Sequence, residues 1–107
     1  MILRLWSGWT TPDLAADYDR VLDTEVAPGI VERGLPGLEQ FEVWRRIAEE
    51  RDDRHEFLTA MRFTDLAAVA EFTGGDPQHS VVPPRARAVL DTFDAHSRHY
   101  ELRRRHV

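Results

Sequence analysis

Hydrophobic and polar positions change their spacing several times along this chain of 107 residues. Alternation with a period of two, which is typical of strands, runs through residues 2–9, 38–47, 56–63 and from His96 to residue 103. Apolar residues at helical spacing lie between the first two of these strands and again, in two shorter pieces, between the last two. This order predicts one α+β domain over residues 1–107, a ferredoxin-like βαββαβ unit with a four-stranded antiparallel sheet.

Local signals mark where the predicted elements begin and end. Thr11 before Pro12 is typical of a helix start, and Pro28 predicts a bend or an end of that helix. Asp65 is expected to cap the second helical stretch, which Gly74 then ends. The charged residues Glu49 to Arg54 are typical of a hairpin connection between the two middle strands.

The second face of the predicted sheet is unusually apolar. Both helices of such a unit cover one face, and we call the opposite one the open face. The pattern places Trp6 and Trp44 on it, together with one of two sets from residues 56–63. Those alternatives are Phe57, Met61 and Phe63, or Leu58 and Ala60. A second copy is the simplest cover, so we predict a homodimer with a pocket for a small hydrophobic molecule between sheet and partner.

Composition and charge narrow the class of function. A formal net charge of −5 argues against nucleic acid as a partner, because phosphate contacts need a basic face. The absence of cysteine excludes disulfides, thiol nucleophiles and thiolate metal sites, and favours a reducing cytoplasm. All fourteen basic residues are arginine, which excludes lysine chemistry and favours a GC-rich bacterial source. The apolar stretch after Met1 is too short to insert into a membrane, so no membrane association is expected.

Histidine and arginine side chains are the remaining candidates for chemistry. His96 and His99 are three apart on the last predicted strand, so only one of them points into a pocket, and no chelating pair or metal site is expected. We favour His99 as a general base, because Tyr100 and Leu102 are the apolar set expected to face the helices. Arg4 and Arg62 lie among apolar residues, where each either binds a ligand anion or pairs with a glutamate such as Glu42, Glu56 or Glu101.

Three passages carry a resemblance to a known family. The opening ILRLWSGWT, the passage AMRFTDLAAV and the ending FDAHSRHYEL, together with the element order, resemble the antibiotic-biosynthesis monooxygenase-like family of dimeric α/β barrels. The resemblance implies a dimer of ferredoxin-like subunits. In active members it also implies oxygenation of phenols or quinols without metal, flavin or other cofactor. Strand one here has no asparagine, which argues against the branch of relatives that degrades haem.

The family's site residues carry over only in part. Its polyketide oxygenases present an asparagine and, four residues later, a tryptophan from strand three, and Thr59 and Phe63 stand at those positions here. The family also uses an arginine in the second crossover to hold substrate oxygens, a role for which Arg85 and Arg87 are both candidates. We take Arg85 as the substrate anchor, with Trp6, Thr59 and Phe63 lining the pocket.

The sequence leaves two functions open, together with the alternative of a purely structural protein. The first is a cofactor-independent monooxygenase-like protein that acts on a hydrophobic phenol or quinol, with His99 as base. The second is a non-catalytic dimeric module that binds a small hydrophobic molecule, which the replacement of the family's asparagine and tryptophan favours. The third reading is a purely structural dimer whose interface holds no cavity.

Overall fold

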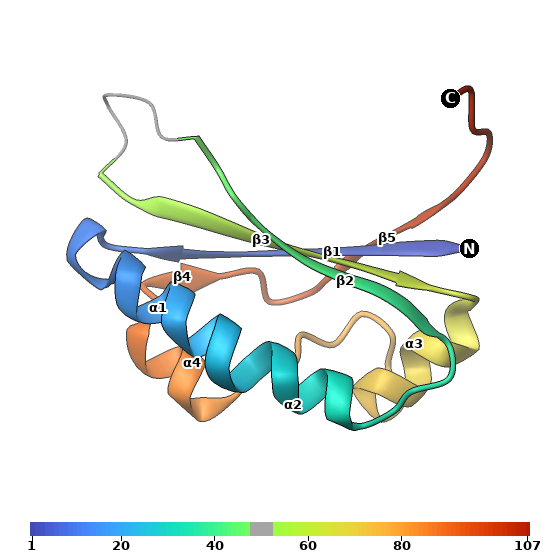
Figure 1. Ribbon diagram of the computed structural model, residues 1–107, viewed down its shortest axis with the longest axis horizontal. Helices are drawn as coiled ribbons and strands as arrows, with labels where there is room; N and C mark the ends of the chain where they lie inside the picture. The colour runs from blue at the N-terminus through green and yellow to red at the C-terminus, as the bar shows by residue number, and fades with distance from the viewer. Residues whose placement is uncertain (48–52) are drawn as a thin grey trace.

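One antiparallel sheet with all helices on a single side makes up the molecule (Figure 1). The computed structural model describes residues 1–47 and 53–107. The strand order is β2-β3-β1, and β4 and β5 both pair with the far side of β1, which confirms the predicted ferredoxin-like α+β fold. The strands are β1 (Ile2–Thr10), β2 (Leu38–Arg45), β3 (His55–Phe63), β4 (Thr92–Phe93) and β5 (Arg98–Glu101).

The first connection is a nearly continuous helix built from four pieces. They are η1 (Pro12–Leu14), α1 (Ala15–Val21), the π-helical η2 (Leu22–Val26) and α2 (Ala27–Glu32). The predicted start at Pro12 is confirmed, although Thr11 makes no side-chain capping bond. Pro28 neither ends nor breaks the helix. The wider π-helical turn of η2 precedes it, and such a turn accommodates a residue that cannot donate a backbone hydrogen bond.

The second connection contains the two predicted helical pieces, α3 (Leu66–Thr73) and α4 (Pro84–Val89). Asp65 caps α3 as expected, since its carboxylate accepts a hydrogen bond from the backbone N–H of Ala68 at 2.8 Å. Gly74 ends the helix with a φ of 86°, a conformation that glycine adopts without the steric cost of a side chain. Both ends of α3 were therefore readable from the sequence.

The last predicted strand is shorter than expected. We predicted a strand from His96, but the structure has the short β4 before it and starts β5 only at Arg98. Ser97 is instead buried, and its backbone N–H bonds to the carbonyl of Gln78 in the second connection. The predicted hairpin turn falls largely on residues 48–52, which lie outside the described residues.

The prediction that Trp6 lies on the open face is wrong. In β1 the even-numbered residues from Ile2 to Thr10 are buried beneath the helices, and Trp6 is among them. Trp44 does lie on the open face, where its register neighbour on β3 is Leu58, so Leu58 and Ala60 are the set that faces away from the helices. Alternation showed which residues share a face, but the polar Arg4 beside Trp6 made that set look like the outer one.

The assignment of Tyr100 and Leu102 to the helix-facing side is also wrong. Tyr100 pairs with Leu3, whose side chain points away from the helices, and both Tyr100 and Leu102 are about half exposed. His99 consequently points toward the helix layer, opposite Arg4 in the β1–β5 register. The helix-covered side holds two core clusters, one around Trp6, Tyr18 and Phe57 and one around Phe63 and Phe72.

Candidate functional site

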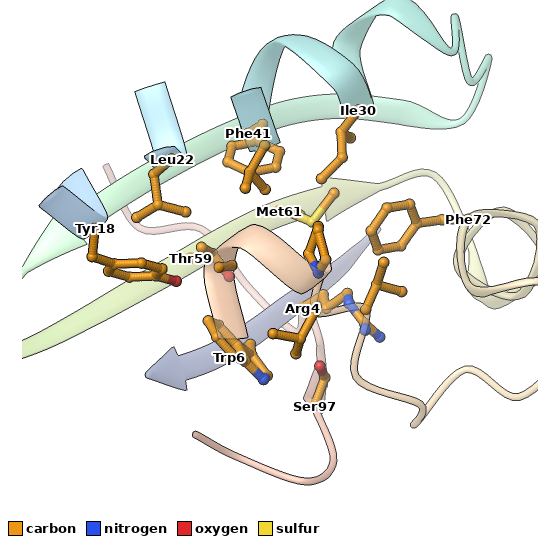
Figure 2. A pocket seen from close by; sticks show the side chains of 15 residues that line it. Arg4, Trp6, Tyr18, Leu22, Ile30, Phe41, Thr59, Met61, Phe72 and Ser97 are labelled. Atoms are coloured by element: carbon orange, nitrogen blue, oxygen red, sulfur yellow. The ribbon is translucent and has the colours of Figure 1, made fainter. Parts of the chain in front are cut away.

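A cavity lies between the sheet and the helices, where the two core clusters meet (Figure 2). We call it the sheet–helix cavity. Its free volume is about 40 Å³, room for roughly three water molecules at about 10–15 Å³ each. It lies within one subunit, on the side opposite the open face where we placed the pocket from the sequence. Its lining consists of Arg4, Trp6, Tyr18, Leu22, Val26, Ile30, Phe41, Thr59, Met61, Phe72, Val81, Val82, Pro83, Ala86 and Ser97.

Arg4 is the charged member of this lining, and it is only 3% exposed. Its Nη1 donates to the carbonyl of Pro77 at 2.6 Å and contacts Nε2 of His99 at 3.0 Å, while its Nη2 donates to the carbonyl of His79 at 2.7 Å. The guanidinium also lies 5.3 Å from the centre of the Phe72 ring. Burial lowers the pKa of Arg4 to about 10, so the side chain is still a cation at neutral pH.

His99 does not line the cavity itself but touches Arg4, which does. Because arginine can only donate hydrogen bonds, Nε2 of His99 accepts from Arg4 and the ring proton of neutral His99 sits on Nδ1. Burial first, and the positive charge of Arg4 second, hold the pKa of His99 below its ordinary value. His99 is therefore a neutral imidazole at physiological pH.

This lowered pKa predicts a specific dependence of stability on pH. The unfolded chain binds a proton at His99 near pH 6.5, whereas the folded protein does so only at lower pH. His99 therefore contributes to the free energy of unfolding at pH values above its pKa in the unfolded chain. This contribution is lost as the pH falls through the pKa that His99 has in the folded protein. In urea titrations, we expect the free energy of unfolding to fall between about pH 8 and about pH 5 in wild type, and to fall less over the same range in His99→Gln. His106→Gln, at the exposed C-terminus, should behave like wild type, and an equal loss in all three proteins would contradict the assignment.

Trp6 and Thr59 both line this cavity, which lies on the other side of the sheet from the pocket predicted for them. They face each other in the β1–β3 register, so neighbouring strands present them side by side. The indole N–H of Trp6 donates to the carbonyl of Asp94 at 2.9 Å, and the hydroxyl of Ser80 donates to the same oxygen at 2.7 Å. Trp6 therefore offers the cavity an apolar ring whose polar atom is already bonded, while Thr59 offers a hydroxyl.

The structure adds two polar cavity residues that the sequence analysis did not single out, Tyr18 and Ser97. Tyr18 reaches in from α1, its ring lies edge-on to Phe57 at 5.0 Å, and burial raises the pKa of its hydroxyl. Ser97 is 5% exposed, and its Oγ has no hydrogen-bond partner among the described residues. A hydroxyl on the apolar stripe of the first helix was a usable signal for Tyr18. Nothing in the local sequence marked Ser97.

Phe63 and Arg85 are not brought to the cavity. Phe63 has no exposed surface and packs against Phe72, with 5.8 Å between ring centres, in the second core cluster. The side chain of Arg85 is 77% exposed and pairs with Glu25 at 2.9 Å on the outer surface of the helix layer. Phe63 shares a sheet face with Thr59, but Met61 and Phe72 fill the space between Phe63 and the cavity.

The position of Arg85 predicts a small effect of its removal. An exposed ion pair contributes about 0–1 kcal/mol, because water screens both charges. We expect Arg85→Ala to change the free energy of unfolding by less than about 1 kcal/mol and to leave ligand-induced changes in melting temperature as in wild type. A loss of those changes without a loss of stability would restore Arg85 to the site.

Known proteins resemble this chain in fold rather than in sequence. No family model matches the chain, and no curated protein matches it. Solved structures do. PA3566 from Pseudomonas aeruginosa is 18% identical and has a TM-score of 0.58, with 95% of this chain and 94% of that chain covered.

Two further structures match over nearly the whole length. An antibiotic biosynthesis monooxygenase is 14% identical, with a TM-score of 0.56 and 97% of this chain and all 100% of the other covered. This chain has the fold of an antibiotic biosynthesis monooxygenase. An ethyl tert-butyl ether d (ethd) family protein from Bacillus halodurans c-125 shares that fold at 15% identity, with a TM-score of 0.57 and coverage of 96% and 100%. The fold expected from the resemblance is thereby confirmed.

Proposed function

We propose that this protein is a cofactor-independent monooxygenase-like protein that oxidises a small phenol or quinol in the sheet–helix cavity. The observation that carries the proposal is the cavity lining, in which apolar side chains surround a guanidinium and the hydroxyls of Tyr18, Thr59 and Ser97. Such a mixture of an apolar wall and a few directed polar groups is typical of small-molecule sites. The fold shared with an antibiotic biosynthesis monooxygenase supports the same class of reaction.

The reaction needs no reducing partner, because the substrate supplies the electrons. Deprotonation gives a substrate anion, which passes one electron to O₂. The two radicals then join to a peroxide anion, which takes the proton back to form a hydroperoxide. Loss of water then converts a CH₂ group and O₂ into a carbonyl and H₂O, so one oxygen atom enters the product and the other leaves as water. What this asks of the protein is to bind the substrate, to favour its deprotonation and to keep bulk water away.

Within this proposal, His99 is the base and Trp6 and Thr59 hold the substrate. The lowered pKa of His99 supplies the neutral imidazole that a base needs. Its Nε2 accepts from Arg4, so proton transfer requires that contact to open. A cavity that binds a single aromatic ring has a volume on the order of 150 Å³, so entry of such a ring requires outward movement of the cavity wall. Val81 is the exposed member of the lining, and we place the entrance beside it.

Oxygen uptake tests the proposal directly. Metal-free protein is offered hydroquinones, anthrones and flavonols, with wild type and His99→Ala side by side and Arg85→Ala as a surface control. Uptake above autoxidation that falls in His99→Ala and stays in Arg85→Ala is the expected result. Uptake that does not fall would remove His99 from the mechanism. If there is no uptake but the melting temperature rises with the same compounds, the protein is the non-catalytic binding module. The loss of the family's asparagine and tryptophan at Thr59 and Phe63 favours that second candidate.

The same proposal includes a homodimer formed through the open face, in a cytoplasmic protein. No helix or other element of the described residues covers that face (Figure 1). Trp44, Tyr100 and Leu102 are each about half exposed on it. A face of this kind, on a sheet whose other side is filled by helices, is typical of a surface that a second subunit covers. Within residues 1–47 and 53–107 no helix is both long and apolar enough to cross a membrane.

A further inference from the structure

Arg4 is a buried cation without an acidic partner among the described residues. Its polar contacts are the carbonyls of Pro77 and His79 and the neutral ring of His99, and no carboxylate of the described residues pairs with it. Moving a charge out of water costs several kcal/mol unless an opposite charge compensates it. The lowered pKa of Arg4 reflects the same cost. An anion bound next to Arg4 would supply the missing compensation.

Arg4 also has more hydrogen-bond donors than partners among the described residues. A guanidinium carries five N–H groups. Nη1 makes two contacts and Nη2 makes one, so the Nε–H and one Nη2 hydrogen have no partner among the described residues. A carboxylate or phenolate oxygen accepts such donors in short, charge-assisted hydrogen bonds.

A second, independent group points to a ligand in the same place. The hydroxyl of Ser97 is buried and has no partner among the described residues, and a buried polar group left in this state normally has a water or a ligand as its partner. Ser97 and Arg4 both line the sheet–helix cavity, and Figure 2 shows the Ser97 hydroxyl directed toward the space beside Arg4. The two side chains come from opposite ends of the chain, so neither is explained by its local sequence.

We propose that Arg4 and Ser97 form a site for the anionic oxygen of an organic acid, a carboxylate or phenolate, whose apolar body lies against Trp6, Thr59 and Met61. The free volume of about 40 Å³ accommodates a group of a few heavy atoms, which is the size of a carboxylate. The apolar body of the ligand then occupies the space that forms when the cavity wall near Val81 moves outward. This inference rests on the proposed function only in that it places a ligand in this cavity, and it requires no oxygen chemistry.

Binding of matched acids and amides tests the site under anaerobic conditions. Benzoate and benzamide have the same shape but differ in charge, as do acetate and acetamide. In calorimetric titrations of the full chain we expect benzoate to bind at least about tenfold more tightly than benzamide, because a hydrogen bond to a charged group contributes about 1.5–3 kcal/mol. Ser97→Ala should weaken benzoate binding about tenfold and leave benzamide binding nearly unchanged.

A matched serine serves as the control. Ser80 is as buried as Ser97, but its hydroxyl already donates to the carbonyl of Asp94 and it does not line the cavity. Ser80→Ala should therefore keep the affinity for benzoate. Arg4→Met should lose the preference for the acid, and where that variant fails to fold, the pair of serine variants still decides the matter. Equal binding of acid and amide, no binding of either acid, or the same loss in Ser80→Ala and Ser97→Ala would overturn the site. A failed oxygen-uptake assay would leave it standing.

Discussion

Replacing Phe63 with alanine is expected to lower the free energy of unfolding by about 3–5 kcal/mol. The side chain has no exposed surface and packs in the cluster formed by Ile2, Met61, Val69 and Phe72, so its removal leaves a cavity that rigid strand and helix backbones cannot close. A domain of this size has about 5–15 kcal/mol of stability in total, so this loss removes a large fraction of it. Urea unfolding followed by circular dichroism measures the loss.

Two controls separate a packing role of Phe63 from a role in binding. Phe63→Leu keeps much of the apolar volume and should cost less than about 1.5 kcal/mol. Leu66→Ala removes an apolar side chain that is about half exposed on the neighbouring helix and should change stability far less. If Phe63→Ala were as stable as wild type but lost its response to ligands, Phe63 would be a cavity residue, as its position in the resemblance implied, rather than a core residue.

Charged substitutions on the open face are expected to convert the proposed dimer into monomers. Trp44 is 55% exposed and Tyr100 is 49% exposed, so a glutamate at either position does not disturb the subunit's own core. In a dimer joined through this face the same carboxylate would be buried without a partner, which costs about 3–5 kcal/mol and raises the dissociation constant by a factor of about 100 or more. Sedimentation of wild type should give twice the subunit mass of 12.4 kDa, and Trp44→Glu and Tyr100→Glu should give the mass of one subunit.

The matched control for the dimer lies on the opposite side of the molecule. Val31 is 61% exposed on α2, in the helix layer, and Val31→Glu should sediment as wild type does. A wild-type protein that is monomeric at micromolar concentration would rule out the dimer. A dimer that survives both open-face substitutions would place its interface elsewhere.

The element order was predictable because each strand and helix shows its own spacing of apolar residues. Asp65 and Gly74 marked the two ends of α3 through local chemistry, and the structure uses them as predicted. The spacing of apolar residues along a strand does not show which of its two alternating sets faces the helices. In β1 the buried set includes Arg4, and the partners that make its burial tolerable are carbonyls 73 and 75 residues away. No local pattern signals such partners.

The candidate site was predictable only in part. Trp6 and Thr59 lie opposite each other on β1 and β3, but alternation had placed Trp6 on the open face, and only the family resemblance had placed Thr59 in a pocket. Arg85 was chosen by analogy of position in the second connection, but helix α4 turns it outward to Glu25. Ser97 was expected in a strand and is found at a cavity wall, because β5 begins one residue later.

The pairing of β1 with β5 has a consequence for how the protein is made. Residues 2–5 are synthesised well before their neighbours in the sheet, residues 98–101, and the N–H of Leu102 bonds to the carbonyl of Met1 at 3.2 Å. Pro77, His79 and His99, which hold Arg4, also come from the last third of the chain. A nascent chain therefore carries a charged strand with an open edge until residues 98–101 have been synthesised, and such distant pairings form slowly. Folding of this domain is expected to finish only after those residues have emerged.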